Sequence, residues 1–321
     1  MDHGPKGAIP TLTPKRMLSA ARRGAKKALF HAHPWYATND TCLDPAVFIV
    51  GCGRSGTTVL REMIDRHPQF AIGAETTFLC DFLNADRLAE IWKLDAAHVR
   101  ELAKRSENVV RFAETFFREH AQREGKPQWG DKTPRNISVL PWLLHAFPNS
   151  RFIHIIRDGR DVACSRATFR THTLVRGKVV KRRQPKTLSY ADAAGEWVRA
   201  VTLGLAYESH PRVTSVRYER LIEEPERELR RVTDFLGVDY SPELLKPREE
   251  RDLKSDPGRL LHNPGAAGAI TKKARGRWRR DLNPTERRNV HRIAGELLKI
   301  LGYAESDAWL DEPQDESDRA G

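Results

Sequence analysis

The sequence predicts an α/β fold in three layers, P-loop-like, with a central, mainly parallel sheet flanked by helices. From residue 46 onward, short apolar runs such as residues 47–50 and 152–156 alternate with longer amphipathic segments. This alternation is typical of parallel strands joined by helices. The first apolar run also leads into a glycine-rich turn at residues 51–58 and then into a helical segment. Strand, glycine-rich turn and helix in this order are typical of a phosphate-binding domain.

The elements follow one another regularly along the chain. Strands are predicted at residues 46–50, 70–72, 128–130, 151–156 and 213–217. Helices are predicted at residues 58–67, 78–92, 96–105, 109–123, 138–146, 158–168, 190–208, 225–236 and 284–301. Pro225 in the first turn and Gly237 at the end mark the bounds of one helix clearly. Residues 170–185 and 250–275 are expected to be loops, and Trp142 and Trp197 are expected in the core.

Three regions are predicted from these patterns. Residues 46–304 form one domain, residues 1–45 form a basic arm that is poorly ordered or a short helix, and residues 305–321 form an acidic, disordered tail. A helix at residues 14–30 would allow peripheral contact with a membrane surface, but its mostly alanine face favours a loosely docked arm. No apolar run approaches the length of a membrane span, and residues 1–10 lack the apolar stretch of a secretory signal.

Composition narrows the class of protein. The hydrophobic fraction of 39% supports a packed core. The four cysteines are irregularly spaced, without a C-x-x-C pair, which predicts reduced thiols and a cytoplasmic location and argues against a zinc site. The net charge of +12, concentrated at residues 170–186 and 272–280, favours an anionic partner. A basic module that binds nucleic acid or acidic surfaces stays an alternative. Trp278 is the aromatic residue within these clusters, and one ring does not favour nucleic acid.

The glycine-rich turn has the spacing of a phosphate-binding loop, with Thr57 where nucleotide triphosphatases carry lysine. Its glycines allow successive N–H groups to point at one anion, and the helix that follows adds its positive end. Arg54 supplies a fixed positive charge, and Ser55 and Thr58 add hydroxyl donors. A ligand-free turn is the alternative, but these side chains together favour an anion.

A second motif follows the strand at residues 151–156. Arg157 emerges at the strand end, where open α/β sheets hold ligands, and Ser165 lies two helical turns further on. The two side chains would converge on one phosphate; a structural salt-bridge cluster has comparable weight on this motif alone. A P-loop kinase would need the missing lysine and an aspartate for Mg²⁺. A phosphosulfate carries less charge on its transferable group, so protein cations and N–H donors can hold it without a metal.

Together these motifs resemble those of sulfotransferases that use 3′-phosphoadenosine-5′-phosphosulfate (PAPS). Gly51-x-x-Arg54-Ser-Gly-Thr-Thr58 is similar to their phosphosulfate loop, and Arg157-x7-Ser165 to their 3′-phosphate motif. The segments starting at Asp131, Val216 and Gly276 are similar to segments of the bacterial, Golgi and tyrosylprotein groups. The resemblance covers roughly residues 46–302.

The resemblance implies transfer of a sulfuryl group from PAPS to a hydroxyl or amine of an acceptor, which leaves 3′-phosphoadenosine-5′-phosphate (PAP) and needs no metal. Arg157 and Ser165 would hold the 3′-phosphate, and Tyr218 would lie near the adenine. The phosphosulfate loop would contribute contacts from Gly53, Arg54, Ser55, Gly56, Thr57 and Thr58. A later loop would close over the 3′-phosphate and base with Lys273, Arg275, Gly276, Arg277 and Trp278.

Three residues are predicted to carry the chemistry. Arg54 and Lys132 are candidate cations for the charge that develops on the leaving oxygen. Glu75 follows the second strand and therefore lies at the carboxyl edge of the sheet, where it is the favoured base. Its placement also resembles that of the tyrosylprotein sulfotransferase base. A surface glutamate in a loop is the alternative without the family context, and a histidine base also stays open, although His154 is expected in the core.

The acceptor is less well indicated than the donor. We expect a glycan, lipid or small metabolite, and the basic segment at residues 170–186 favours an anionic one on charge alone. The sequence gives no indication of the oligomeric state.

Overall fold

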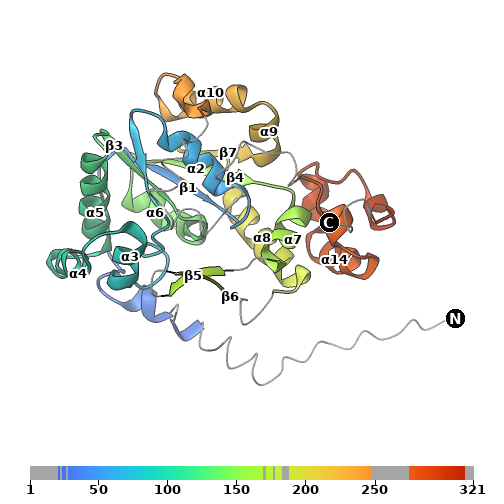
Figure 1. Ribbon diagram of the computed structural model, residues 1–321, viewed down its shortest axis with the longest axis horizontal. Helices are drawn as coiled ribbons and strands as arrows, with labels where there is room; N and C mark the ends of the chain where they lie inside the picture. Colours follow the sequence, from blue (N-terminus) through green and yellow to red (C-terminus); the bar gives the residue numbers. More distant parts are fainter. Residues whose placement is uncertain are drawn as a thin grey trace.

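A computed structural model describes residues 21, 24–26, 28–168, 171–175, 178–182, 188–246 and 275–314, the backbone alone at 171–175 and 178–182. Its centre is a five-stranded, all-parallel sheet in the order β2-β3-β1-β4-β7, which confirms the predicted fold class (Figure 1). The strands are β1 (Val47–Gly51), β2 (Phe70–Ile72), β3 (Gln128–Lys132), β4 (Arg151–Ile156) and β7 (Val213–Arg217).

Helices pack on both faces of the sheet. Those in the first half of the chain are α2 (Thr57–Asp65), α3 (Ala85–Trp92), α4 (Ala96–Arg105), α5 (Val109–Arg123), the 3₁₀ helix η1 (Pro134–Val139), α6 (Leu140–Ala146) and α7 (Gly159–Ala167). Those in the second half are α8 (Tyr190–Leu205), α9 (Tyr218–Glu223), α10 (Pro225–Leu236), the 3₁₀ helix η2 (Pro242–Leu245), α13 (Trp278–Asp281), α14 (Pro284–Ile300) and the 3₁₀ helix η5 (Asp307–Leu310). None of the described helices is long and apolar enough to cross a bilayer.

The central strand β1 shows why both faces of the sheet are covered. Its residues are all buried, and alternate side chains enter two different clusters. Phe48 and Val50 pack with residues of α5 and α6, whereas Val47 and Ile49 pack with residues of α2, α9 and α10. An uninterrupted apolar strand of this kind is typical of a parallel sheet between two helical layers.

A third cluster places the elements that follow β4. Trp197 of α8 is fully buried, as expected, and its ring lies so close to Gly159 that a Cβ there would be 2.7 Å from the ring atom Cδ2. The indole N–H also donates to the carbonyl of Arg157, at 3.0 Å. These contacts fix the connection from β4 to α7. Trp142, which we also expected in the core, is only half-buried and donates to the carbonyl of Thr38.

The structure differs from the predicted domain boundary at the N-terminal side. Phe30, Tyr36 and Cys42 are buried in the same cluster as α5 and α6, although all three precede residue 46. The Tyr36 hydroxyl accepts a hydrogen bond from the N–H of Leu83, at 2.6 Å. The segment from residue 28 onward therefore belongs to the domain, because its aromatic residues find partners in the loop before α3.

The C-terminal boundary also needs correction. The predicted disordered tail begins at residue 305, but Asp307–Leu310 form η5 and Trp309 is buried. Its ring meets that of Trp278 edge to face, with centroids 5.4 Å apart. The acidic composition of this segment does not indicate such packing, which depends on one buried tryptophan.

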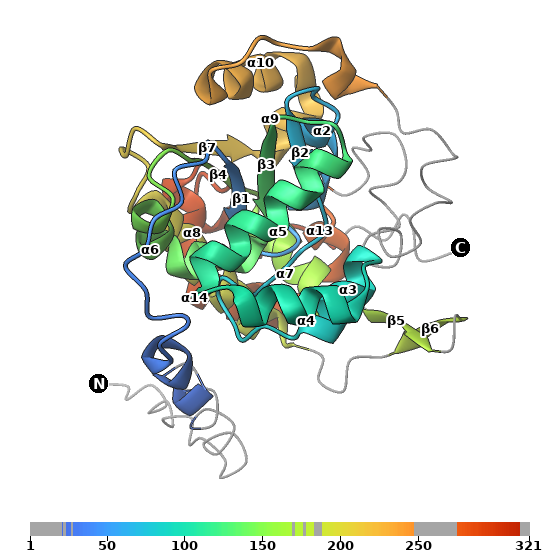
Figure 2. The ribbon, with the colours of Figure 1, turned by 90° about the vertical axis from the view of Figure 1, so that its left-hand side faces the viewer.

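Two further elements depart from the expected pattern. The predicted loop at residues 170–185 contains an antiparallel hairpin, β5 (Thr171–Val175) and β6 (Lys178–Arg182), which projects from the body of the molecule (Figure 2). The predicted helix at residues 78–92 begins only at Ala85, because Asn84 caps it by accepting the N–H of Arg87. Most of the loop predicted at residues 250–275 lies outside the described part of the chain.

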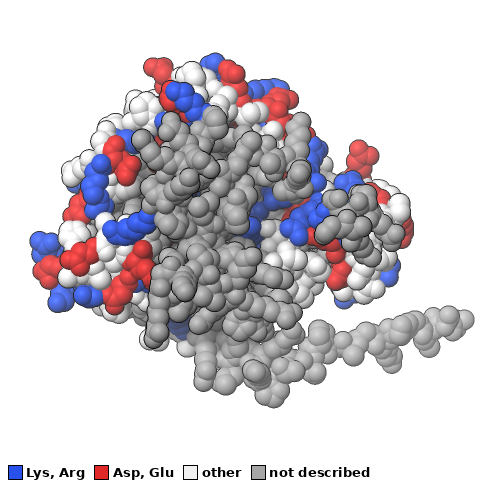
Figure 3. All heavy atoms as spheres, in the orientation of Figure 1, with Lys and Arg blue, Asp and Glu red and all other residues white. Residues whose placement is uncertain are grey.

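Charged side chains of both signs alternate around the rim of the face drawn in Figure 3. Many are paired across one helical turn, such as Arg230 with Glu226 on α10. Among the described residues of this face, the excess of positive charge therefore does not form one continuous surface.

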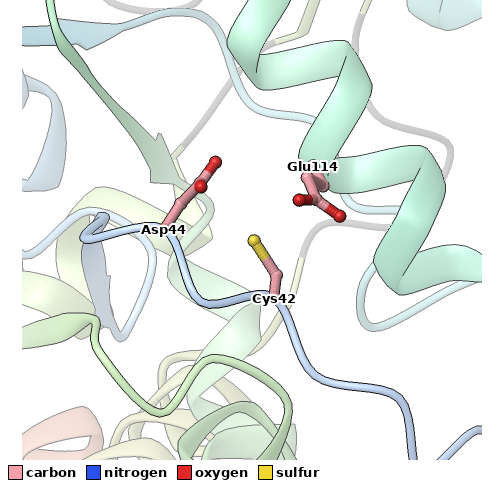
Figure 4. Close-up of side chains that lie close together, drawn as sticks. All are labelled: Cys42, Asp44 and Glu114. Atoms are coloured by element: carbon pink, nitrogen blue, oxygen red, sulfur yellow. The ribbon is translucent and has the colours of Figure 1, made fainter.

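One group of possible metal ligands occurs among the described residues, formed by Cys42, Asp44 and Glu114 (Figure 4). Arg118 is bound to Asp44 at 2.5 Å and to Glu114 at 2.8 Å, and the indole of Trp129 donates to Asp44. Burial raises the pKa of the Cys42 thiol to about 12. These contacts neutralise the carboxylates and tie the N-terminal segment to α5 and β3, so the group is a structural anchor.

Candidate active site

The predicted site residues gather at one edge of the sheet because they follow the carboxyl ends of five parallel strands. In spatial order across that edge, they are Glu75 after β2, Lys132 at the end of β3, the glycine-rich loop after β1, Arg157 after β4 and Tyr218 after β7. In Figure 1, α2 and α7 follow β1 and β4, two strands that are neighbours in the sheet.

The ring of Tyr218 packs against the glycine-rich loop at Gly56. Gly56 has φ of 96°, and a Cβ on it would lie 2.3 Å from Cδ2 of the Tyr218 ring. Arg54 also has a positive φ, 77°, which is uncommon for a residue with a side chain and is concentrated at functional sites. The predicted role of Tyr218 near an adenine remains a prediction, but the structure places its ring directly behind the loop.

The two predicted phosphate motifs are in direct contact. Nε of Arg54 donates to the hydroxyl of Ser165, at 3.1 Å, and a guanidinium nitrogen of Arg157 donates to the carbonyl of Arg54, at 3.3 Å. The Arg157 guanidinium also lies over the Tyr218 ring, 4.7 Å from its centroid. The glycine-rich loop and the segment from Arg157 through α7, about 100 residues apart in sequence, thus form a single site.

Positive charge accumulates around this contact. Burial, followed by the nearby charge of Arg157, lowers the pKa of Arg54 to about 10, and Arg166 and Arg277 act in the same direction. Arg166 itself pairs with Glu196 and donates to the carbonyl of Gly53. Several cations held close to partly buried backbone N–H groups favour an anion in the space between them.

Lys132 and Glu75 form an ion pair beside the loop. The Lys132 ammonium is 2.6 Å from a carboxylate oxygen of Glu75 and 3.4 Å from the Thr58 hydroxyl. The lysine side chain is 5% exposed, whereas that of Glu75 is 48% exposed. The glutamate is therefore accessible from solvent and oriented by a buried cation, in contrast to an isolated surface residue.

A buried carboxylate behind this pair was missed by sequence reasoning. Asp131 accepts hydrogen bonds from the hydroxyls of Thr133 and Thr76, at 2.9 and 3.2 Å, and from the amide of Asn136, at 2.6 Å. Burial raises its pKa to about 7. The signal was the run of polar residues at the end of β3, from which we selected only Lys132. Asp131 holds Thr76, so it fixes the turn that carries Glu75.

The closing loop is described from residue 275 onward, and Lys273 lies outside the described residues. Arg275 pairs with Glu223, and Arg277 donates to Asp281 at 2.6 Å and to the Thr168 hydroxyl at 3.3 Å. Gly276 has φ of 74°. The loop therefore lies against α7, near the predicted 3′-phosphate motif.

Trp278, predicted in the loop that closes over the 3′-phosphate and base, lies in the core. The ring is 1% exposed and packs against Trp309 and the guanidinium of Arg160, which lies 4.0 Å from its centroid. Trp278 is thus a core residue that anchors the closing loop. Its position among arginines in the sequence is compatible with burial, because cations also stack on buried rings.

The histidine alternatives for the base do not reach the site. His154 is completely buried, and neither ring nitrogen has a hydrogen-bond partner among the described residues. Burial lowers its pKa to about 4, so it is a neutral core residue as expected. His67 is buried below α2, where its Nε2 lies 2.9 Å from the carbonyl of Asp239.

Comparisons with known proteins agree with this arrangement. A model of the sulfotransferase family matches residues 45–242. A putative protein-tyrosine sulfotransferase of Caenorhabditis briggsae is 28% identical over 273 residues, which cover 83% of this chain and 91% of that protein. Protein-tyrosine sulfotransferase 1 of Danio rerio is 28% identical over 214 residues, which cover 64% of this chain and 56% of that protein. The match thus spans nearly the whole first relative and about half of the second.

Solved structures share the fold. The sulfotransferase domain of the Synechococcus olefin synthase matches with a TM-score of 0.57 and 22% identity, over 82% of this chain and 98% of that chain. The sulfotransferase domain of the curacin biosynthetic pathway matches with a TM-score of 0.56 and 21% identity, over 80% of this chain and 98% of that chain.

Proposed function

The chain belongs to the sulfotransferase family, whose model matches well over half of it, and we propose that it transfers a sulfuryl group from PAPS to an acceptor hydroxyl. The contact between Arg54 and Ser165 carries this proposal. It joins an anion-binding loop to a second cationic motif, so one nucleotide with anionic groups at its 5′ and 3′ positions can span both. Holding the donor at two points fixes its reactive group for in-line attack.

The residues at the strand ends divide the chemistry. Arg54 and Lys132 would neutralise charge on the 5′-phosphate oxygen as its bond to sulfur breaks. Glu75 would accept the proton of the acceptor hydroxyl as the new oxygen–sulfur bond forms. In the structure Lys132 is bound to Glu75. We expect an anion in the loop to draw Lys132 toward itself, which leaves the carboxylate a stronger base.

Two other functions fit parts of the sequence. A P-loop kinase would hold ATP with Mg²⁺, and Thr57 replaces the lysine that it requires. A module for nucleic acid would use aromatic rings as stacking platforms for bases, but Trp278, the aromatic residue within the basic clusters, is buried. Neither alternative explains why two predicted phosphate-binding motifs lie next to each other at the carboxyl edge of one sheet.

The acceptor proposal extends beyond the family assignment. We retain a hydroxyl on a glycan, lipid or small metabolite, with a preference for anionic molecules. Because relatives are named protein-tyrosine sulfotransferases, tyrosine-containing peptides are included among the acceptors to be tested. The cytoplasmic location also stays a prediction.

Calorimetric titration tests the donor assignment directly. PAP should bind with clearly higher affinity than ATP with Mg²⁺, since Arg157 and Ser165 favour a 3′-phosphate. Absence of PAP binding, or equal affinity for ATP with Mg²⁺, would overturn the proposed function.

Replacement of the base separates binding from chemistry. Glu75→Gln should keep PAP affinity within a few-fold and lower the rate of sulfuryl transfer about 10²- to 10⁴-fold, the usual contribution of general base catalysis. Glu226→Gln is the matched control, because Glu226 also pairs with a cation but lies on exposed α10. Turnover retained in Glu75→Gln would remove Glu75 from the role of base.

A further inference from the structure

Asp161 is a buried carboxylate for which the proposed chemistry has no use. It lies in the first turn of α7, between Arg157 and Ser165, and its side chain is 1% exposed. One oxygen accepts the backbone N–H of Gly276, at 2.8 Å, and the other accepts that of Trp278, at 3.2 Å. The same carboxylate lies 3.7 Å from the guanidinium of Arg157.

These contacts connect two parts of the chain that are 115 residues apart. Arg157 reaches the Arg54 carbonyl on one side and Asp161 on the other, so its guanidinium is oriented from both directions. The N–H groups of Gly276 and Trp278 hold the closing loop against α7. Arg277, between them in sequence, is thereby placed near Thr168 and close enough to lower the pKa of Arg54.

We propose that Asp161 is a positioning residue that assembles the 3′-phosphate side of the donor site from α7 and the closing loop. Its carboxylate orients Arg157 and docks residues 276–278, so that Arg157, Ser165 and the loop face the same phosphate. This proposal rests on the proposed function. It assigns no direct contact between Asp161 and the donor, whose phosphate a buried carboxylate would repel.

The burial of Asp161 supports a positioning role. Desolvation, with the nearby charge of Asp158, raises its pKa to about 6, while Arg157 and the two N–H donors act in the opposite direction. A carboxylate retained at such a cost needs its donors and its cation in place. Arg160, the preceding residue in α7, stacks on Trp278 and holds the loop independently of this carboxylate.

The independent hold by Arg160 gives a way to separate positioning from general stability. Asp161→Asn keeps the size of the side chain and one acceptor oxygen but loses the charge. The folded variant should bind PAP about 10- to 100-fold more weakly, as expected when a charged hydrogen-bonding group is lost. Its affinity for 5′-AMP, which lacks the 3′-phosphate, should stay within about twofold of the wild type. A merely structural defect would weaken both ligands alike.

Asp44→Asn is the matched control, because Asp44 also binds an arginine and an N–H donor. It precedes the start of β1 and therefore lies away from the carboxyl ends of the strands. It should lower the melting temperature without changing the ratio of PAP to 5′-AMP affinity. If wild-type protein fails to bind PAP, the proposed function fails. If the wild type prefers PAP and Asp161→Asn keeps the same preference, the role of Asp161 is overturned.

Hydrogen exchange of the wild-type protein provides a second test that does not depend on the variant folding. Because coupling between two sites is reciprocal, PAP should slow exchange of the Gly276 and Trp278 amides, and 5′-AMP should leave it unchanged. Equal protection with both ligands would contradict the proposal.

Discussion

At the scale of single residues, the phosphate loop depends on what packs behind it. A Cβ on Gly56 would meet the ring of Tyr218, whose position is fixed by the end of β7 and by the stacked guanidinium of Arg157. A Cβ on Gly53 would meet only the far end of the Arg166 side chain, at 2.8 Å, which can move. The two glycines therefore tolerate substitution differently, although their spacing in the motif gives no hint of it.

Gly56→Ala should lower the free energy of unfolding by about 2 kcal/mol or more, because the methyl group both clashes with Tyr218 and disfavours a φ of 96°. It should also abolish measurable PAP binding by distorting the loop. Gly237→Ala is the matched control, with φ of 74° and open space around the added Cβ, so it should cost only about 1 kcal/mol. Chemical denaturation and calorimetry measure the two effects. Equal losses in the two variants would rule out the clash.

Arg54 illustrates a second property at this scale, the difference between charge and hydrogen-bond geometry. Arg54→Lys keeps the positive charge but loses the Nε donor to Ser165. We expect its turnover to fall less than that of Arg54→Ala, for which a decrease of about 10²- to 10³-fold is typical when a donor to developing charge is removed. Rates under saturating PAPS check this order. Arg230→Ala, on exposed α10, should leave turnover unchanged, and equal rates for Lys and Ala at position 54 would contradict a charge-based role.

At the scale of elements, the strand ends explain what the sequence could and could not predict. Parallel pairing brings the residues after β1, β3 and β4 to one edge whatever lies between them, so Arg54, Lys132 and Arg157 were accessible to pattern reasoning. The contact of Asp161 with the closing loop was not. It joins backbone N–H groups to a side chain 115 residues away, and neither partner has a local sequence signature.

The C-terminal segment is a further element whose packing escaped prediction. Trp309 of η5 packs against Trp278, and the guanidinium of Arg160 lies near both rings. The hydroxyl of Tyr303 donates to Glu219, at 3.0 Å, and Glu219 in turn accepts the N–H of Asp158. The residues just before and at the start of α7 are thus held from the C-terminal side, which links the end of the chain to the donor site.

Trp309→Ala should therefore lower stability by about 3–5 kcal/mol, as expected for loss of a large buried ring, and should also weaken PAP binding in the folded fraction. Trp142→Ala is the control, since Trp142 is half-buried, donates to the carbonyl of Thr38 and packs against the cluster that contains α5 and α6. It should lower stability without changing PAP affinity. Unchanged PAP affinity in folded Trp309→Ala would show that the C-terminal segment acts on stability alone.

At the scale of the whole molecule, the domain is larger than the alternation of strands and helices suggested. Aromatic residues at positions 30, 36 and 309 join clusters built mainly from other segments. Burying them extends the core at both ends of the chain, and the Tyr36 hydroxyl at Leu83 connects the N-terminal segment to the loop before α3. Such contacts depend on the assembled surface, so no local periodicity reports them.

Buried carboxylates also give the whole molecule a characteristic pH dependence, which Asp131 makes testable. Its pKa is raised from 3.8 to about 7 by burial, so the folded protein binds more protons than the unfolded chain between these values. The contribution of Asp131 to stability is fully present below about pH 4 and is lost as pH rises through about 7, with a slope of at most about 1.4 kcal/mol per pH unit. Asp131→Asn removes this loss. The amide introduced at position 131 can donate to the side-chain oxygen of Asn136 once the Asn136 amide rotates to face it. That oxygen has no partner among the described residues.

The free energy of unfolding of Asp131→Asn, minus that of the wild type, should accordingly increase from pH 5 to pH 7.5. Urea denaturation at intervals across this range measures this difference. Contributions of other groups, including Asp161, cancel in the difference because both proteins contain them.

Asp44→Asn provides the opposite case. Hydrogen bonds and charge from Arg118, together with the Trp129 donor, outweigh burial and lower the pKa of Asp44. Its contribution is therefore lost only below about pH 4, and the difference for this variant should be flat over the same interval. A flat profile for Asp131→Asn would mean that Thr76, Thr133 and Asn136 stabilise the ionised carboxylate enough to offset its burial, so that the turn carrying Glu75 keeps the same support at every working pH.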